Sequence, residues 1–269
     1  MAIETVFVMN NTSVVQDEVL SHRLGLIPIY ADARKFEYLP QGGEPTDVNT
    51  LVFELHARCS LNPEFNADMA AQEQQEKIHS LSASKRFVNG SVYSGQLTWI
   101  PQGSQKEIFA ADPVRPCHAD ILLAKMRPGQ EIDLEVHCVK GVGKEHAKWA
   151  PVSCCTYRLM PKISISAPIE GAEAHKFAKC FAPGVVKVVT DASTGNETAV
   201  VVEPRYDTVS RECLRHPEFK EKVVLSRVAD HFIFQIETVG FLQPHEVVVE
   251  AIKTLQEKCA RLQASLSSL

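Results

Sequence analysis

The chain has 269 residues, of which 45% are hydrophobic and 23% are charged, and its formal net charge is −5. This composition is typical of a soluble globular protein with room for one or two hydrophobic cores. No run of about eighteen apolar residues occurs, which excludes a membrane-spanning helix of ordinary length. The negative net charge disfavours a protein that is itself the main nucleic-acid contact, because phosphate binding needs a clustered basic surface.

The amino-terminal residues lack the basic and apolar regions of a secretory signal peptide. The eight cysteines include no C-x-x-C pair, and in a chain of this length they do not indicate a disulfide framework. We therefore expect reduced thiols, as found in the cytosol or the nucleus.

The first predicted elements are a strand and a short helix. Residues 4–9 alternate in the manner of a strand. Ser13 and Gln16 form a capping-box pattern, and Gly25 is placed for the positive φ that ends many helices. Pro28 prevents continuation, so the pattern predicts a helix of about ten residues followed by an extended segment.

Alternating polarity predicts further strands in the first half of the chain, and the clearest is residues 51–59, with apolar side chains on one face. The polar residues 62–89 are interpreted as a surface excursion. Residues 118–126 fit either a strand or a single helical turn. Strands are also predicted at residues 92–100, 131–140 and 152–159.

After Pro161 the pattern predicts a second group of elements. Residues 185–191 and 197–204 form a predicted hairpin, and residues 172–181 a short helix. The remaining expectations are a strand at 162–166, a helical turn within 205–215 and a strand at 230–240.

The last predicted element is a long helix over residues 243–269, with Pro244 suited to its first turn. Apolar residues recur along it at alternating steps of four and three, which places them on one narrow face. Such a face packs either on the sheet of its own domain or on a helix of another subunit. The residues of this apolar stripe are Val248, Ile252, Leu255, Cys259, Leu262 and Leu266.

The glycine-rich loop that follows residue 140 is not a phosphate loop. The full pattern needs a glycine at Cys138 and a Ser or Thr at Glu145. We interpret the loop instead as presenting Lys144, Lys148 and Trp149 to a partner protein. The alternative is that Trp149 covers the core of its own domain.

Neither a metal site nor a catalytic centre is predicted. His137 and Cys138 are adjacent in a strand, so their side chains point to opposite faces, and the same holds for Cys154 and Cys155. A Cys–His nucleophile would also need an orienting acid and oxyanion donors, which no motif supplies. We predict no catalytic residue, no metal and no cofactor.

Three stretches of the chain resemble the alpha-like subunit family of multisubunit RNA polymerases. They are QDEVLSHRLGLIPI at residues 16–29, LLAKMRPGQEIDLEVHCVKGVGKEHAKWAPV at 122–152, and DHFIFQIETVG with the following helix. Within the family the chain is most similar to the larger alpha-like subunits shared by eukaryotic RNA polymerases I and III. The zinc loop of the polymerase II relative and the iron–sulfur insert of some archaeal relatives cannot be built, because only Cys59 and Cys180 stand in those regions.

The resemblance implies an α+β fold in two discontinuous parts, like the amino-terminal domain of the bacterial alpha subunit. An inserted, mostly antiparallel β domain is expected over 1–160. A dimerisation domain, a sheet with the long C-terminal helix, is expected over 161–269. Members of the family have a further strand and helix before the position of Met1, which are expected to be absent here.

The resemblance also implies the partners. The apolar stripe would pair with a smaller alpha-like subunit. His22 and Arg23 at the helix end would contact a large subunit, although the residues alone allow that they only bind local carbonyl groups. The loop residues expected at the same large-subunit interface are Gly141, Gly143, Lys144, His146, Lys148 and Trp149.

The implied function is structural. The heterodimer would form a platform for the second-largest subunit within RNA polymerases I and III, which transcribe rRNA, 5S rRNA and tRNA in the nucleus, including the nucleolus. The chain would contact other polymerase subunits but make no sequence-specific nucleic-acid contact. Two alternatives are an alpha-like subunit of RNA polymerase II or of an archaeal enzyme, and a stand-alone Cys/His enzyme.

Overall fold

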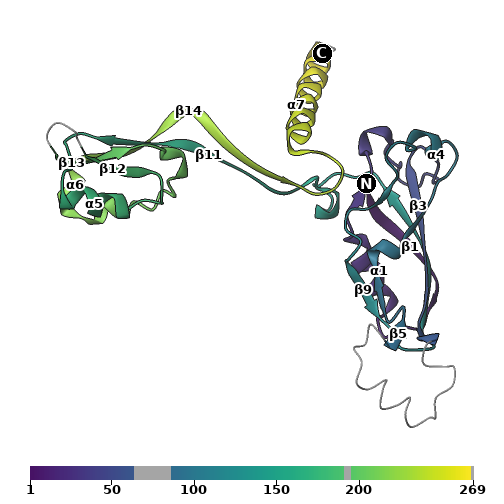
Figure 1. The fold of residues 1–269 in the computed structure, drawn as a ribbon. Coiled ribbons are helices and arrows are strands. Elements are labelled where there is room, and N and C mark those ends of the chain that lie inside the picture. The colour runs from purple at the N-terminus through teal and green to yellow at the C-terminus, as the bar shows by residue number, and fades with distance from the viewer. Residues whose placement is uncertain (64–85, 191–194, 268–269) are drawn as a thin grey trace, which may run out of the picture. The chain divides into compact units, whose positions relative to one another are not determined.

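The computed structural model of the chain describes residues 1–63, 86–190 and 195–267. Its internal contacts divide it into two compact units. The first unit contains Met1–Ser153 together with Glu237–Leu269, and the second contains Cys154–Ile236. Figure 1 labels the elements of each unit.

The first unit is organised on a four-stranded antiparallel sheet with the order β1-β10-β3-β7. In its centre Leu134 lies opposite Leu55, and both side chains are buried. Alternate residues of β10 face the same core, which confirms the half-buried strands predicted from the alternating pattern. The strands are β1 (Ala2–Asn11), β3 (Thr50–Arg58), β7 (Thr98–Ile100) and β10 (Glu131–Val139).

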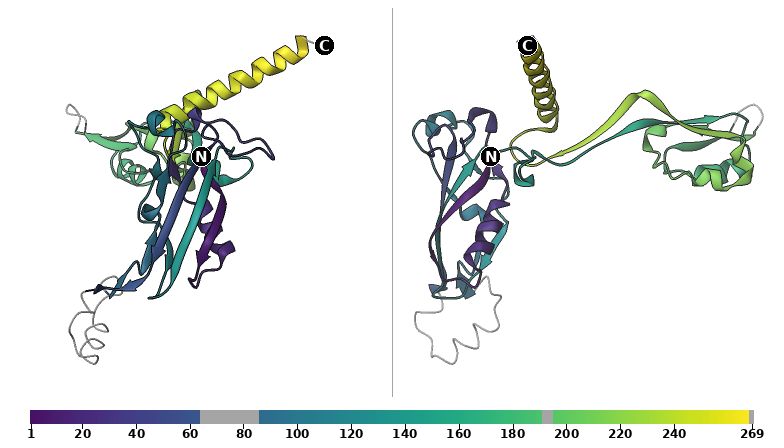
Figure 2. Two further views of the ribbon diagram at one scale, coloured as in Figure 1. Left: turned by 90° about the vertical axis from the view of Figure 1, so that its right-hand side faces the viewer. Right: turned by 180° about the vertical axis from the view of Figure 1, so that it is seen from behind.

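Helix α1 (Asp17–Gly25) packs beside β1 (Figure 2), and it buries Leu20 and Leu24. The predicted capping box is wrong, because Gln16 is the N-cap and the Ser13 hydroxyl instead donates to Asn11 Oδ1 at 2.7 Å. The positive φ predicted for Gly25 is also wrong. Gly25 is the last helical residue, and Leu26 continues in a right-handed conformation while its N–H reaches the carbonyls of the last turn.

The strand predicted over residues 92–100 is interrupted. A 3-10 helix at Ser94–Gln96 separates β6 (Ser91–Tyr93) from β7. Two hydrogen bonds hold this turn: the buried Ser94 hydroxyl donates to the His118 carbonyl, and the Gly95 N–H donates to the Ala119 carbonyl. Residues 62–89 lie largely outside the described residues. The shorter elements are β2 (Ile29–Tyr30) with β8 (Arg115–Pro116), β9 (Leu122–Lys125) with β6, β4 (Ser60–Leu61) with β5 (Phe87–Val88), η1 (Ala33–Lys35) and α4 (Gln105–Ile108).

The second unit is built around a small core of aromatic side chains. Phe177 of α5 (Ala172–Lys179) and Phe219 of α6 (Pro217–Lys220) meet edge to face with centroids 5.2 Å apart. The predicted hairpin and short helix are confirmed. The strands are β11 (Val152–Ile165) paired with β14 (Val223–Thr238), and β12 (Val186–Thr190) paired with β13 (Glu197–Val201); the 3-10 helices are η5 (Pro204–Tyr206) and η6 (Glu212–Arg215).

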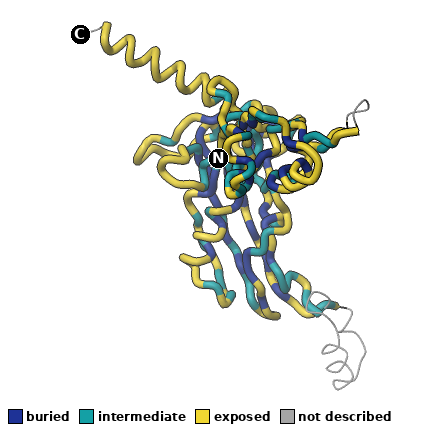
Figure 3. Tube along the Cα trace, turned by 90° about the vertical axis from the view of Figure 1, so that its left-hand side faces the viewer, coloured by how far each residue is buried: buried dark blue, intermediate teal, exposed yellow. Residues whose placement is uncertain are grey.

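Helix α7 (Pro244–Ser267) has no buried residue in the described chain, as its colour in Figure 3 shows. It belongs to the first unit, where its first turns contact Arg34. This division differs from the expected one, since the boundary at residue 160 falls inside β11. The expected domains 1–160 and 161–269, with the helix covering a sheet, therefore stay a prediction for the assembled subunit.

The loop after β10 folds back onto its own unit. The Trp149 Nε1–H donates to the Val139 carbonyl at 3.1 Å, and Trp149 is half-buried. Lys148 lies over the indole ring at 4.5 Å and donates to the Ile3 carbonyl at 2.9 Å. Gly141 lies directly against this indole. A Cβ at Gly141 would come within 2.4 Å of Trp149 Cδ2 and Cε2, so only glycine fits there.

We predict that Gly141→Ala lowers the free energy of unfolding by about 1–3 kcal/mol, because the Trp149 indole must move and its hydrogen bond is disturbed. Urea denaturation of the full chain measures the difference. The matched control is Gly143→Ala in the same loop, where the nearest atom to the new Cβ lies 3.3 Å away. Equal destabilisation by the two substitutions would contradict this account of Gly141.

Candidate partner-binding surfaces

The apolar stripe of α7 is a hydrophobic surface without a counterpart in the described chain. Leu255 is 62% exposed and Leu266 is 71% exposed. Every described residue from 251 onward is exposed, including Cys259. A helix with one continuous apolar face is normally buried along that face. The structure thus places all six predicted stripe residues on the surface of the isolated chain.

The start of α7 is held by polar contacts. Glu246 Oε2 accepts the Gln243 N–H at 3.0 Å, which satisfies a free donor at the helix start. This hydrogen bond, together with Arg34, lowers the pKa of the Glu246 carboxyl. Arg34 lies 3.4 Å from Glu246 and is itself oriented by Asp32 at 2.9 Å. Hence, within the described residues, contacts with the rest of the chain hold only the first turns of α7, and the rest of the stripe is exposed for another chain.

A second exposed apolar surface lies on the β11–β14 ribbon. The Tyr157 ring lies 5.9 Å from the Phe232 ring and 5.7 Å from the Phe234 ring, measured between centroids. All three side chains are more than half exposed. We call these three residues the aromatic cluster. The period-two placement of Phe232 and Phe234 was visible in the sequence, but the contribution of Tyr157 depends on strand pairing and was missed.

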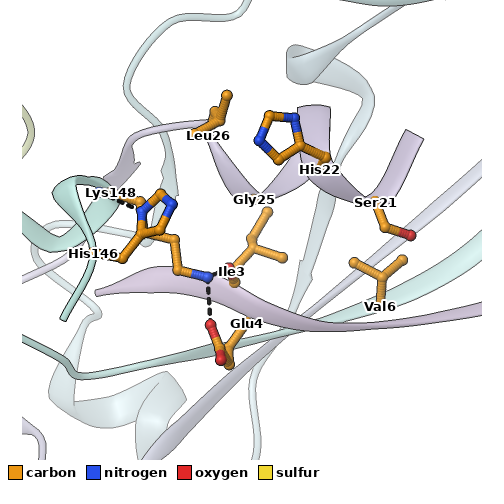
Figure 4. A pocket seen from close by; sticks show the side chains of 9 residues that line it. All are labelled: Ile3, Glu4, Val6, Ser21, His22, Gly25, Leu26, His146 and Lys148. Atoms are coloured by element: carbon orange, nitrogen blue, oxygen red, sulfur yellow. Dashed lines mark hydrogen bonds and ion pairs between the residues drawn. The ribbon is translucent and has the colours of Figure 1, made fainter. Parts of the chain in front are cut away.

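The third surface is a pocket of about 330 Å³ between α1 and the loop after β10 (Figure 4). His22 reaches it from the end of α1, and His146 from the loop. The Lys148–Glu4 ion pair lies along its wall, and the His146 Nδ1 accepts the Lys148 N–H at 3.0 Å, which orients this imidazole at the pocket. The lining residues, which we call the histidine pocket, are Ile3, Glu4, Val6, Ser21, His22, Gly25, Leu26, His146 and Lys148.

The predicted large-subunit residues are therefore only partly brought together. Gly141, Gly143 and Trp149 line a separate pocket of about 310 Å³ with Phe241 and Leu242, and Lys148 lines both pockets. Lys144 is exposed and lines neither. The Arg23 guanidinium donates to the Leu122 carbonyl at 2.6 Å, so it joins α1 to β9 rather than to carbonyls of its own helix end.

Burial makes several of the cysteines poorly suited to nucleophilic catalysis. Burial raises the pKa of Cys138 to about 12, so it is a neutral thiol at physiological pH. Burial also raises the pKa values of Cys59 and Cys180. Among the described residues no group of three or more His, Cys, Asp and Glu side chains is arranged to hold a metal ion. None of the described helices is both long and apolar enough to cross a membrane.

Comparison with known proteins identifies the fold. Residues 6–152 match the family model described as the RNA polymerase Rpb3/RpoA insert domain. The chain is 48% identical to DNA-directed RNA polymerases I and III subunit RPAC1 of Homo sapiens, over 100% of this chain and 74% of the relative. It is 43% identical to the subunit of that name from Saccharomyces cerevisiae, over 97% of this chain and 75% of the relative.

A polymerase II subunit is less similar. The chain is 28% identical to DNA-directed RNA polymerase II subunit rpb3 of Dictyostelium discoideum, over 99% of this chain and 82% of the relative. The family resemblance seen in the sequence is confirmed. The chain belongs to the alpha-like RNA polymerase subunits that contain the Rpb3/RpoA insert domain.

Proposed function

We propose that this chain is a non-catalytic assembly subunit shared by RNA polymerases I and III, acting in the nucleus, including the nucleolus. The greater identity to polymerase I and III subunits than to the polymerase II subunit supports this choice. As such a subunit it serves the synthesis of rRNA, 5S rRNA and tRNA. The observation that carries the proposal is the exposed apolar stripe of α7.

The stripe is the surface that pairs with a smaller alpha-like subunit. Exposed in water, it is a contiguous apolar patch of the kind that soluble monomers avoid. Burying it removes that surface from water at roughly 25 cal/mol per Å² of apolar area. The positions beside the stripe are mostly uncharged, with Val249, Gln256 and Gln263 along one edge. Apolar contact, rather than flanking ion pairs, therefore dominates the pairing.

The aromatic cluster is a second surface that a polymerase subunit covers. Three neighbouring aromatic rings on a two-stranded ribbon have no covering layer among the described residues. Aromatic side chains are enriched in the buried centres of protein interfaces.

The histidine pocket is the contact for the second-largest subunit. It combines two segments that the family resemblance assigned to an interface with a large subunit, the end of α1 and the loop after β10. Lys148 and Trp149 fix the loop, so His146 is held in place before the partner binds. Leu26 beside the pocket is 52% exposed and supplies apolar area.

The first test concerns the stripe. Leu255→Asp places a charge in the centre of the proposed interface and should abolish the complex with a co-expressed smaller alpha-like subunit. The milder Leu255→Ala should weaken it by about 2–5 kcal/mol if the site is fully desolvated. Size-exclusion chromatography with light scattering measures the complex.

Ala264→Asp is the matched control, since it adds the same charge on the opposite side of the helix. The control should assemble as the unmodified chain does. A normal heterodimer with Leu255→Asp would show that the stripe does not form the interface.

The second test uses the chain's own thiols as reporters. Cys259 lies within the stripe, and Cys155 lies two residues before Tyr157 on the same face of β11; both are exposed. A maleimide should modify both in the free chain and neither in the assembled polymerase, because both are then covered. Site-resolved mass spectrometry measures the labelling. Buried Cys138 should stay unlabelled in the folded chain, and equal labelling of Cys259 in both states would refute the proposal.

The third test separates the two interfaces. The double substitution His22→Glu and His146→Glu places two carboxylates in the histidine pocket beside Glu4. It should reduce co-purification of the second-largest subunit by about tenfold or more while leaving the smaller alpha-like subunit bound. His118→Glu, at an exposed histidine outside the pocket, is the control. Undiminished recovery of the second-largest subunit would exclude this pocket from the interface.

A further inference from the structure

A small pocket of the second unit gathers positive charge. It measures about 50 Å³ and lies where β11 and β14 meet the segment between η5 and η6. Three cations, Lys162, Arg211 and Arg227, line it, and Asp207 is the single acid among its lining residues. The other lining residues are Pro161, Ile163, Val209, Leu225 and Ser226.

Three basic residues elsewhere in the unit form ion pairs with acids. Lys176 pairs with Glu218, Lys222 with Glu173, and Arg215 with Glu212. In the described part of the chain, by contrast, the side chains of the three cations that line the pocket make neither an ion pair nor a hydrogen bond. Unpaired cations that converge on one cavity produce a local positive potential, which attracts an anion.

The backbone beside the cations is held in a costly conformation. Val209 has φ of 58° and Arg211 has φ of 59°, both in the left-handed region, which a β-branched residue rarely adopts. Arg158 fixes the preceding residues by donating to the carbonyls of Asp207 and Arg205 at 3.0 and 2.6 Å. Strain of this kind persists only where the surroundings enforce it, and it concentrates at ligand-binding sites.

The same segment supplies free backbone donors. Among the described residues, the N–H groups of residues 208–211 have no acceptor. Successive N–H groups near a left-handed residue form the concave anion sites known as nests. Val209 and Arg211 of this segment also line the pocket, so backbone donors lie near the cationic side chains, and both favour an oxyanion over a neutral ligand.

The size and walls of the pocket define the anion further. About 50 Å³ holds roughly three or four water-sized groups, which suits a tetrahedral oxyanion. The pocket also has apolar walls, formed by Pro161, Ile163 and Leu225. A free ion would make no use of such walls, whereas the carbon atoms of a peptide would pack against them. No aromatic residue lines the pocket, whereas single-stranded nucleic acid is normally held by stacking on aromatic rings along a groove.

We propose that this pocket binds a phosphate group carried by a phosphorylated segment of a protein partner. Lys162, Arg211 and Arg227 supply the charge, and the strained backbone supplies N–H donors. Asp207 is the single acid among the lining residues, so an excess of positive charge remains for the phosphate. The site lies wholly within the second unit and is separate from the stripe and the histidine pocket.

The test uses the full chain, purified together with the polymerase subunits that accompany it. A fluorescent phosphoserine peptide is titrated by anisotropy, and inorganic phosphate competes at constant ionic strength. We expect the phosphopeptide to bind saturably and the unphosphorylated peptide not to bind. Free phosphate should displace the phosphopeptide only at a higher concentration. The double substitution Arg211→Gln and Arg227→Gln should weaken phosphopeptide binding by about tenfold or more.

The matched control is the double substitution Lys187→Gln and Lys220→Gln, which removes the same charge from exposed positions of the unit outside the pocket. It should bind as the unmodified chain does. Circular dichroism shows that both variants are folded. Equal weakening in both variants would show a diffuse charge effect and overturn the proposal. Displacement of the peptide by free phosphate at equal concentration, or tighter binding of single-stranded RNA than of the phosphopeptide, would also overturn it.

Discussion

The structure depends above all on burying apolar surface, and the described chain buries it unevenly. The sheet of the first unit and the aromatic centre of the second are closed by their own side chains. The stripe of α7 and the aromatic cluster of the β11–β14 ribbon remain in water. Because the hydrophobic effect is the main favourable contribution to folding and association, covering these two surfaces would contribute most to the free energy of binding a partner. The assembly role follows from this imbalance.

The first unit shows how a surface for a partner can be prepared by intramolecular contacts. Lys148 and Trp149 belong to the loop that the sequence assigned to a partner, yet their polar groups bind the backbone of their own unit. This arrangement places His146 opposite His22. It also restricts the conformations of the loop before a partner binds, so binding costs less conformational entropy. The two interpretations of the loop are therefore compatible: Trp149 can cover its own domain while the loop meets a partner.

The second unit contains both paired and unpaired basic side chains, and its composition does not reveal which are which. Three of its basic side chains, Lys176, Arg215 and Lys222, pair with nearby carboxylates, which for exposed pairs stabilises the fold only slightly. The three cations around the pocket beside Val209 are not neutralised. Unpaired charge next to enforced backbone strain indicates ligand binding rather than folding stability.

The sequence by itself determined the local elements and the family. Strict alternation in β3 and β10, and the four-three spacing in α7, follow from the periodicities of strand and helix, so they could be predicted from residues alone. The apolar stripe was predicted residue by residue for the same reason. The capping box at Ser13 failed because the helix begins only at Asp17, with Gln16 as its N-cap, and the Ser13 oxygen accepts the N–H of Val15 instead.

Only the tertiary structure decided which distant residues meet. The convergence of His22 with His146, of Tyr157 with Phe232 and Phe234, and of Lys162 with Arg211 and Arg227 depends on strand pairing and loop paths that no local pattern records. The break at Ser94 has the same origin, because its hydroxyl is satisfied by a carbonyl 24 residues away. Periodicity decides which face of an element is apolar, whereas packing decides what that face touches and which polar groups share a pocket.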